Sequence, residues 1–167
     1  MSDVIRGKVW FGAFEDGNDA VCVANFDMPA RPAVGWEAKC EDIYRATQNL
    51  MDSWSLTAEQ LNEFFGDIEK KDGASWITPT NMKGNRAYDN KPCGHRSMSV
   101  GDVVQFGRDH DKKTYWAVAG FGFTELTSRQ YDRWLGTDSR DRDMFVRDIV
   151  KAKATVELIA KEEALVN

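Results

Sequence analysis

The sequence predicts an α+β fold, in which an antiparallel sheet of two or more hairpins is covered on one side by about four helices. Two pairs of strand-like apolar runs are each followed by two segments of helical periodicity, in the order ββ-αα-loop-ββ-αα. This order lacks the alternation of strand and helix that builds a parallel, doubly wound sheet. A chain of 167 residues has the usual size of one domain, so we expect residues 1–167 to form a single domain.

The first predicted elements are two strands that form an N-terminal hairpin. Residues 4–14 and 21–26 are rich in Val, Phe and Trp, which favour strands. Between them, the Asp-Gly-Asn sequence at residues 16–18 supplies side chains that tolerate turn conformations. Pro29 and Pro32 then predict an extended connector that leads to the first helix.

Two helices are expected next. Between residues 36 and 54, the larger or apolar side chains recur in steps of three and four, which is the period of one helix face. Thr57 is a good N-cap, and Gln60 stands at the capping-box position of a second helix that ends before Gly73. The outer face of this second helix is acidic because it carries Glu59, Glu63 and Asp67.

The second half of the chain repeats the order of strands and then helices after a long loop over residues 73–96. A hairpin is predicted over residues 98–124, with the charged segment 108–113 at its tip. A short helix over residues 127–134 and a long one over residues 139–165 complete the fold. We expect the long helix to bury an apolar stripe made of Phe145, Ile149, Ala152, Val156 and Ile159.

Composition narrows the class of protein. No apolar run approaches the roughly 20 residues of a membrane helix, and the N-terminus lacks the pattern of a signal peptide. We therefore expect a cytoplasmic protein without a membrane partner. The net charge of −5 has the wrong sign for a general nucleic-acid coat. The three cysteines Cys22, Cys40 and Cys93 are odd in number and widely spaced, which favours reduced thiols. The oligomeric state stays open.

Only one group of residues suggests catalysis. His95 lies two residues from Cys93, and with Asp102 these side chains could form a base, a nucleophile and a carboxylate. Residues two apart seldom face each other productively, so a packed histidine is the preferred interpretation and an enzyme centred on His95 the less favoured one. The sequence contains no CxxC or HxxxH spacing, phosphate loop or dinucleotide fingerprint, and we expect no metal and no cofactor.

The loop before the hairpin is the strongest candidate for nucleic-acid contact. It gathers cations that could hold phosphates and aromatic side chains that could stack on bases. A simple solvated loop explains the same composition. The candidate binding residues are Trp76, Lys83, Arg86, Tyr88, Lys91, His95 and Arg96.

The hairpin carries the one resemblance to a known family. Residues 94–104 read Gly-His-Arg-Ser-Met-Ser-Val-Gly-Asp-Val-Val, which resembles the Gly-His-Ser-Leu-Ser-Val-Ser/Gly-Asp-Val-Val signature of the YodL-like domain. Residues 122–126 are similar to the Gly-Phe-x-Glu-Leu ending of that family, so the resemblance extends over about 93–126. Residues 43–49, in the predicted first helix, add to it, whereas Arg96 departs from the usual spacing. The motif positions are Gly94, His95, Ser97, Ser99, Gly101 and Asp102.

The resemblance implies an accessory protein of a phage or mobile element, and it transfers no catalytic residue and no cofactor. The leading interpretation is a non-catalytic protein that binds a host or viral protein, with a role in anti-defence or host takeover in the host cytoplasm. Its contact surface would be the loop over residues 76–96, the acidic helix face or exposed aromatic side chains. The alternative is a nucleic-acid-binding protein that uses the basic loop over residues 83–96.

Overall fold

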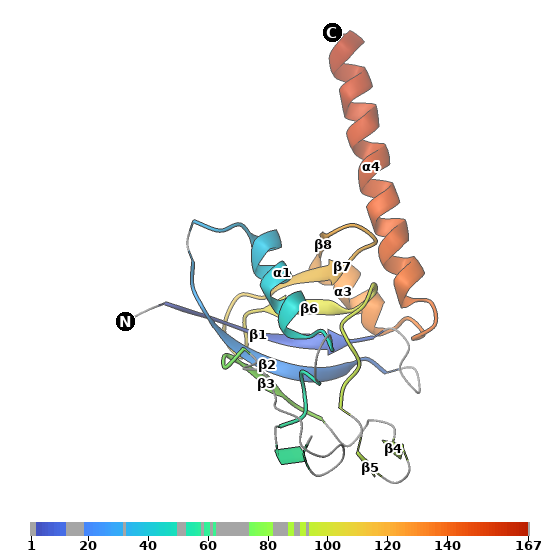
Figure 1. The fold of residues 1–167 in the computed structure, drawn as a ribbon. Coiled ribbons are helices and arrows are strands. Elements are labelled where there is room, and N and C mark those ends of the chain that lie inside the picture. Colours follow the sequence, from blue (N-terminus) through green and yellow to red (C-terminus); the bar gives the residue numbers. More distant parts are fainter. Residues whose placement is uncertain are drawn as a thin grey trace.

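The centre of the molecule is a six-stranded antiparallel sheet in the order β3-β2-β1-β6-β7-β8 (Figure 1). Its strands are β1 (Val4–Phe11), β2 (Val21–Pro29), β3 (Ile77–Pro79), β6 (Val103–Phe106), β7 (Thr114–Val118) and β8 (Phe123–Leu126). The structure is a computed structural model. It describes residues 3–12, 19–31, 33–49, 53–57, 59–60, 62, 74–81, 87–88, 91–92 and 94–166. For residues 87–88 and 91–92 only the backbone is described.

Both predicted hairpins are present, and one strand pairing unites them. β1 pairs with β2, and β6 pairs with β7, each in antiparallel register. β1 also pairs with β6, so that Val9 lies opposite Val104. The predicted hairpin over residues 98–124 is in fact a three-stranded meander, because β8 adds a strand beyond β7. The two halves of the chain therefore share one sheet.

Helices cover both faces of the sheet, which corrects the expectation that they lie on one side. On one face, α1 (Trp36–Ala46) buries Cys40 and Ile43 against a core that includes Val104. On the other face, α3 (Ser128–Leu135) places Trp134 in a second core with Val103. Neighbouring residues of a strand point to opposite faces, so Val103 and Val104 of β6 contribute to different cores.

The first helix is shorter than predicted. α1 ends at Ala46, although the apolar spacing predicts a helix that continues to residue 54. Polar side chains after Ala46 bond elsewhere: Gln48 Nε2 donates to the Met98 carbonyl at 3.2 Å, and Asn49 Nδ2 donates to the His95 carbonyl at 2.9 Å. Side chains of this type compete with helical hydrogen bonds, so the chain leaves the helix here.

The structure describes three helices and only the start of the predicted second one. Thr57 Oγ1 accepts a hydrogen bond from Gln60 N, and Gln60 Oε1 accepts one from Thr57 N, which is the predicted capping box. Most of this helix and its acidic face lie outside the described residues. The loop predicted over residues 73–96 is also partly wrong, because it contains the edge strand β3 and the short pair β4 (Ala87–Tyr88) and β5 (Lys91–Pro92).

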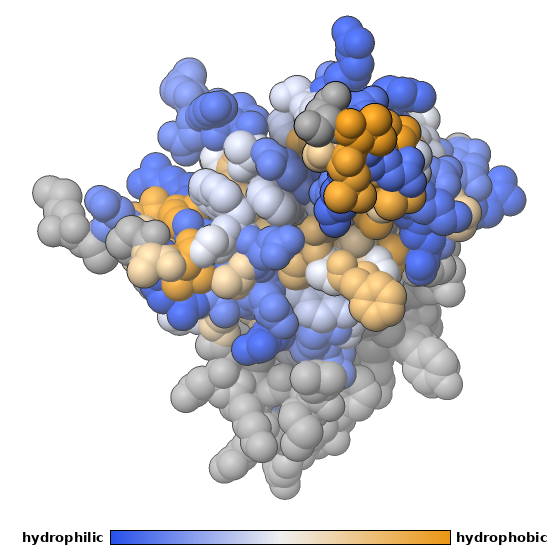
Figure 2. Space-filling model, turned by 90° about the horizontal axis from the view of Figure 1, so that it is seen from above, coloured by the Kyte–Doolittle hydropathy of each residue, from blue (hydrophilic) through white to orange (hydrophobic). Residues whose placement is uncertain are grey.

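The last helix, α4 (Arg142–Val166), leaves the domain and projects away from it (Figure 1). Arg142 and Val146 are buried, but every residue from 150 to 166 is exposed. The prediction that α4 buries its whole apolar stripe is wrong, because Val156 is 66% exposed and Ile159 is 49% exposed. Figure 2, seen from above, shows hydrophobic atoms gathered near the free end of this helix. Among the helices described, none is long and apolar enough to cross a membrane.

A buried arginine fixes the base of α4. The Arg142 guanidinium donates to the carbonyls of Trp134 at 2.9 Å, Leu135 at 2.9 Å and Gly12 at 3.0 Å. Two of these carbonyls belong to the last turn of α3, where carbonyl groups lack partners within the helix. Arg142 therefore ties the ends of α3 and β1 to the first turn of α4.

Candidate functional site

The motif of residues 94–104 makes contacts inside the fold, and Asp102 is at their centre. The Asp102 side chain is fully buried and accepts hydrogen bonds from Gly12 N at 2.9 Å and Ser99 N at 2.8 Å. Arg96 binds it in a bidentate way, with N···O distances of 2.6 and 2.9 Å. The Arg96 guanidinium also lies 4.1 Å from the centre of the Phe11 ring. The arginine that departs from the YodL-like spacing is therefore the partner of Asp102.

His95 is a packed histidine. Its side chain stacks on Trp54 with ring centres 5.5 Å apart, and its Nε2 lies 2.7 Å from the Thr80 carbonyl oxygen, to which it donates. Burial lowers the pKa of His95, the Thr80 carbonyl opposes this shift, and the charge of Arg96 adds to it. His95 is 3% exposed and Asp102 is fully buried. Both side chains are therefore enclosed by the fold, and Cys93 lies outside the described residues.

Gly94 and Ser97 connect the motif to the segment that follows α1. A Cβ atom on Gly94 would lie 2.4 Å from Ser53 Oγ and 2.6 Å from Ser55 Oγ, so only glycine fits there. Ser97 Oγ accepts a hydrogen bond from Asn49 N at 2.8 Å. These contacts are structural, and they hold the entry to β6 against the end of α1.

Gly101 connects the motif to the helices on the other face. Its φ angle is +95°, a conformation that favours glycine. A Cβ atom here would lie 2.9 Å from Asp143 N, in the first turn of α4. The Gly101 carbonyl accepts a hydrogen bond from Trp134 Nε1 at 2.8 Å. The motif therefore supports the base of α4.

Of the seven side chains predicted to contact nucleic acid, the structure describes those of Trp76, His95 and Arg96. Trp76 is half-buried and packs edge-on against Phe26, with ring centres 6.5 Å apart. His95 and Arg96 are engaged as described above. The remaining candidates are not placed: Lys83 and Arg86 lie outside the described residues, as do the side chains of Tyr88 and Lys91.

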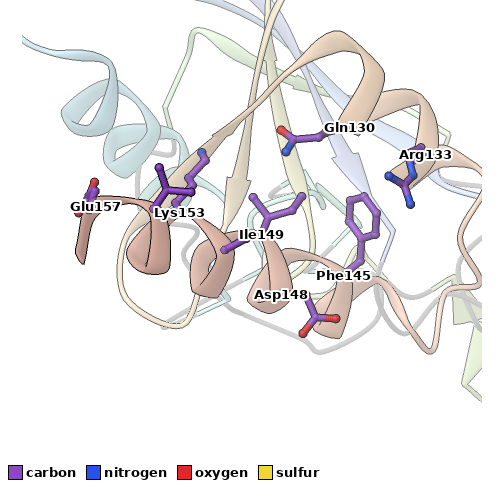
Figure 3. Close-up of a pocket in the computed structure, with 9 residues that line it drawn as sticks. Gln130, Arg133, Phe145, Asp148, Ile149, Lys153 and Glu157 are labelled. Carbon is purple, nitrogen blue, oxygen red and sulfur yellow. The ribbon is translucent and has the colours of Figure 1, made fainter. Parts of the chain in front are cut away.

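The structure reveals instead a groove between α3 and α4, with a volume of about 620 Å³ (Figure 3). In Figure 3, Gln130 and Arg133 of α3 lie above Phe145 and Ile149 of α4. The wall formed by α4 is mainly apolar and its rim is charged. The groove is lined by Gln130, Arg133, Phe145, Asp148, Ile149, Ala152, Lys153, Val156 and Glu157.

Lys153 ties α4 to the edge of the sheet at the point where the helix leaves the domain. Its Nζ donates to Thr124 Oγ1 at 2.7 Å and to the Glu125 carbonyl at 2.5 Å. Both acceptors belong to β8, the last strand of the sheet. Because Lys153 reaches over β8 from the helix and occupies the Glu125 carbonyl, it also hinders this edge strand from pairing with another strand. Beyond Lys153 the helix continues with every residue exposed, and we call residues 154–166 the free half of α4.

The groove was not predicted from the sequence, because the apolar stripe of α4 was expected to pack into the core of the same molecule. The length of the helix argues against that expectation. A helix of 25 residues is roughly 38 Å long at 1.5 Å per residue. A small domain is only about 30 Å across, so part of such a helix must extend past the core. That length was the signal available in the sequence.

Comparisons of the chain with protein-family models, with curated proteins and with solved structures find no match. The YodL-like resemblance therefore stays a prediction based on the motif. The α3–α4 groove, with its apolar wall and charged rim, is the feature from which a function can be proposed.

Proposed function

We propose that this chain is a non-catalytic protein that acts by binding another protein through the α3–α4 groove and the free half of α4. The supporting observation is the apolar stripe of α4, which begins in the groove and continues into solvent. Apolar side chains spaced by three and four on an exposed helix are the pattern used when one helix packs against another. The charged rim would then set the orientation of the partner.

The exposed stripe is costly unless a partner covers it. Val156 and Ile159 are 66% and 49% exposed. Full burial of a side chain of this kind stabilises a protein or a complex by about 1.5–3 kcal/mol. A helix shorter than about 12–15 residues is also marginal in water without tertiary contacts, and the free half of α4 has only the helix below it for support. Binding would supply both the burial and the contacts.

The resemblance to YodL-like proteins supports a setting in a phage or mobile element. In that setting the partner is a host or viral protein, and the consequence of binding is anti-defence activity or host takeover in the host cytoplasm. The motif contributes indirectly, since its residues hold the base of the helix that carries the contact surface.

The test is capture of identified proteins from host lysate by the tagged chain and two matched variants. Val156→Asp places a charge in the stripe, whereas Ala154→Asp places the same charge on another face of the same exposed helix. We expect a partner, identified by mass spectrometry, to be retained by the wild type and by A154D and to be lost with V156D. Equal retention by both variants would contradict the proposal. Circular dichroism checks that both variants keep the helix.

A further inference from the structure

We infer that the occupant of the α3–α4 groove is the free half of α4 from a second copy of this chain, in an antiparallel homodimer. This inference rests on the proposed function: a second copy of the chain occupies the same surface as long as no host or viral protein is bound there. It commits to one arrangement, in which each copy places its free half in the groove of the other. Such a two-fold contact closes on itself and leaves neither groove empty.

The α4 wall of the groove and the free half of α4 have the same length. The groove takes its α4 wall from Phe145 to Glu157, a stretch of 13 residues, and the free half comprises the 13 residues 154–166. At 1.5 Å per residue each stretch is roughly 20 Å long. The two stretches overlap around Val156. An antiparallel pair with its two-fold axis near Val156 therefore lays each free half along the groove wall of the partner.

The two parts of α4 carry opposite net charges. Between residues 147 and 153, α4 carries three cations and one anion, which are Arg147, Lys151, Lys153 and Asp148. Between residues 157 and 163 the balance is reversed, with three anions and one cation, which are Glu157, Glu162, Glu163 and Lys161. Antiparallel pairing places the basic part of one helix beside the acidic part of the other. A parallel pair would oppose like charges.

The stability of a lone helix does not account for this charge order. The N-terminal end of a helix favours anions and its C-terminal end favours cations, because the backbone dipoles add along the axis. The last turn of α4 has no basic residue, and Glu162 and Glu163 lie close to it. This acidic end gains favourable neighbours when the basic part of a second α4 lies beside it. The charges therefore suit an antiparallel partner better than a solitary helix.

The free half of α4 carries an exposed apolar surface. Val156, Ile159 and Val166 continue the stripe, and Val166 is 86% exposed at the end of the helix. In the antiparallel arrangement Val166 reaches the partner's Phe145 and Ile149, which are half-buried in the groove wall. The two-fold axis near Val156 thus brings the exposed apolar end of each α4 to the partly open apolar groove wall of the other copy.

Sedimentation equilibrium of the purified chain tests the stoichiometry. We expect a mass twice the 18.9 kDa of the chain for the wild type and for Ala154→Asp. Val156→Asp should halve that mass, since it places two like charges at the axis. Reversal of charge in Glu162→Lys/Glu163→Lys should weaken the dimer, and mixing this variant with Lys151→Glu should restore association. A wild-type chain that stays at 18.9 kDa would overturn the inference.

Cysteine cross-linking tests the direction of the helices. In a Cys22→Ser/Cys93→Ser background, Val156→Cys lies near the two-fold axis and should form a disulfide between copies under mild oxidation. Leu165→Cys lies far from its own copy in an antiparallel pair and should not cross-link. Cross-linking at both positions would indicate parallel helices and would overturn the arrangement.

The two proposals fail in different ways. A monomeric wild type that still loses an identified lysate partner upon the Val156→Asp substitution would overturn the homodimer and leave the binding function standing. A monomer whose capture of partners is unaffected by Val156→Asp would contradict both.

Discussion

Substitution of Asp102 by Asn tests whether the 94–104 motif is structural. Within the described residues, the carboxylate accepts two hydrogen bonds from the backbone and two from Arg96. The amide keeps the shape but loses one acceptor and the negative charge, so donors that point at it lose their partner. Breaking a buried ion pair by removing one member costs about 3–5 kcal/mol. Because the Arg96 side chain is 28% exposed and can be partly hydrated, we expect a loss at the lower end, about 3 kcal/mol.

This loss is measurable by thermal and urea unfolding followed by circular dichroism. For a chain of this size, about 3 kcal/mol corresponds to a decrease in Tm of about 6–12 °C. Asp132→Asn is the matched control, because Asp132 is exposed on α3, and it should leave Tm nearly unchanged. If D102N unfolded like the wild type and yet lost its binding partner, the motif would be a functional site and our structural reasoning would be refuted.

Three further predictions concern buried polar groups. Burial lowers the pKa of His95, so the unfolded chain binds a proton at higher pH than the folded chain, and the free energy of unfolding falls as pH drops below about 6.5. His95→Gln should remove this part of the pH dependence, which is at most about 1.4 kcal/mol per pH unit in the free energy of unfolding measured by urea titration. If the free energy of unfolding fell with pH as steeply in the variant as in the wild type, His95 would not be its source. Arg142→Met should lower the free energy of unfolding by about 3–5 kcal/mol, because three carbonyls lose the buried cation that donates to them. The exposed control Arg140→Met should change it by less than about 0.5 kcal/mol. Equal Tm values for the two variants would count against this role of Arg142. Cys40 is fully buried and burial raises its thiol pKa, so alkylation mapped by mass spectrometry should reach it only after unfolding; rapid labelling of the native chain would show that the core opens locally.

Local signals in the sequence predicted much of the fold. The spacing of Thr127 and Gln130 predicted the start of α3, and the structure contains that capping box with both hydrogen bonds. The charged segment 108–113 was correctly placed in the turn between β6 and β7. These features depend on residues that are neighbours in the chain, so short windows of sequence contain the information that sets them.

Features that depend on distant residues were not predicted. α1 ends at Ala46 because Gln48 and Asn49 bond to residues 50 and 46 positions away. The pairing of β1 with β6 joins segments nearly 100 residues apart, for which the strands themselves carry no local signal. For the candidate site, the apolar stripe of α4 was visible in the sequence. Its exposure was not, because periodicity identifies an apolar face without saying which molecule covers it.

Because Gly101 lies so close to α4, the motif helps to set the direction in which this helix leaves the domain. The first turn of the helix contacts the position where a side chain at residue 101 would be, so the absent Cβ sets the angle at which α4 leaves the sheet. The helix acts as a lever: a shift of about 1 Å across its first turn of about 5.4 Å grows to roughly 7 Å at the far end of a 25-residue helix. A change as small as Gly101→Ala would therefore re-aim the contact surface without altering any residue on it.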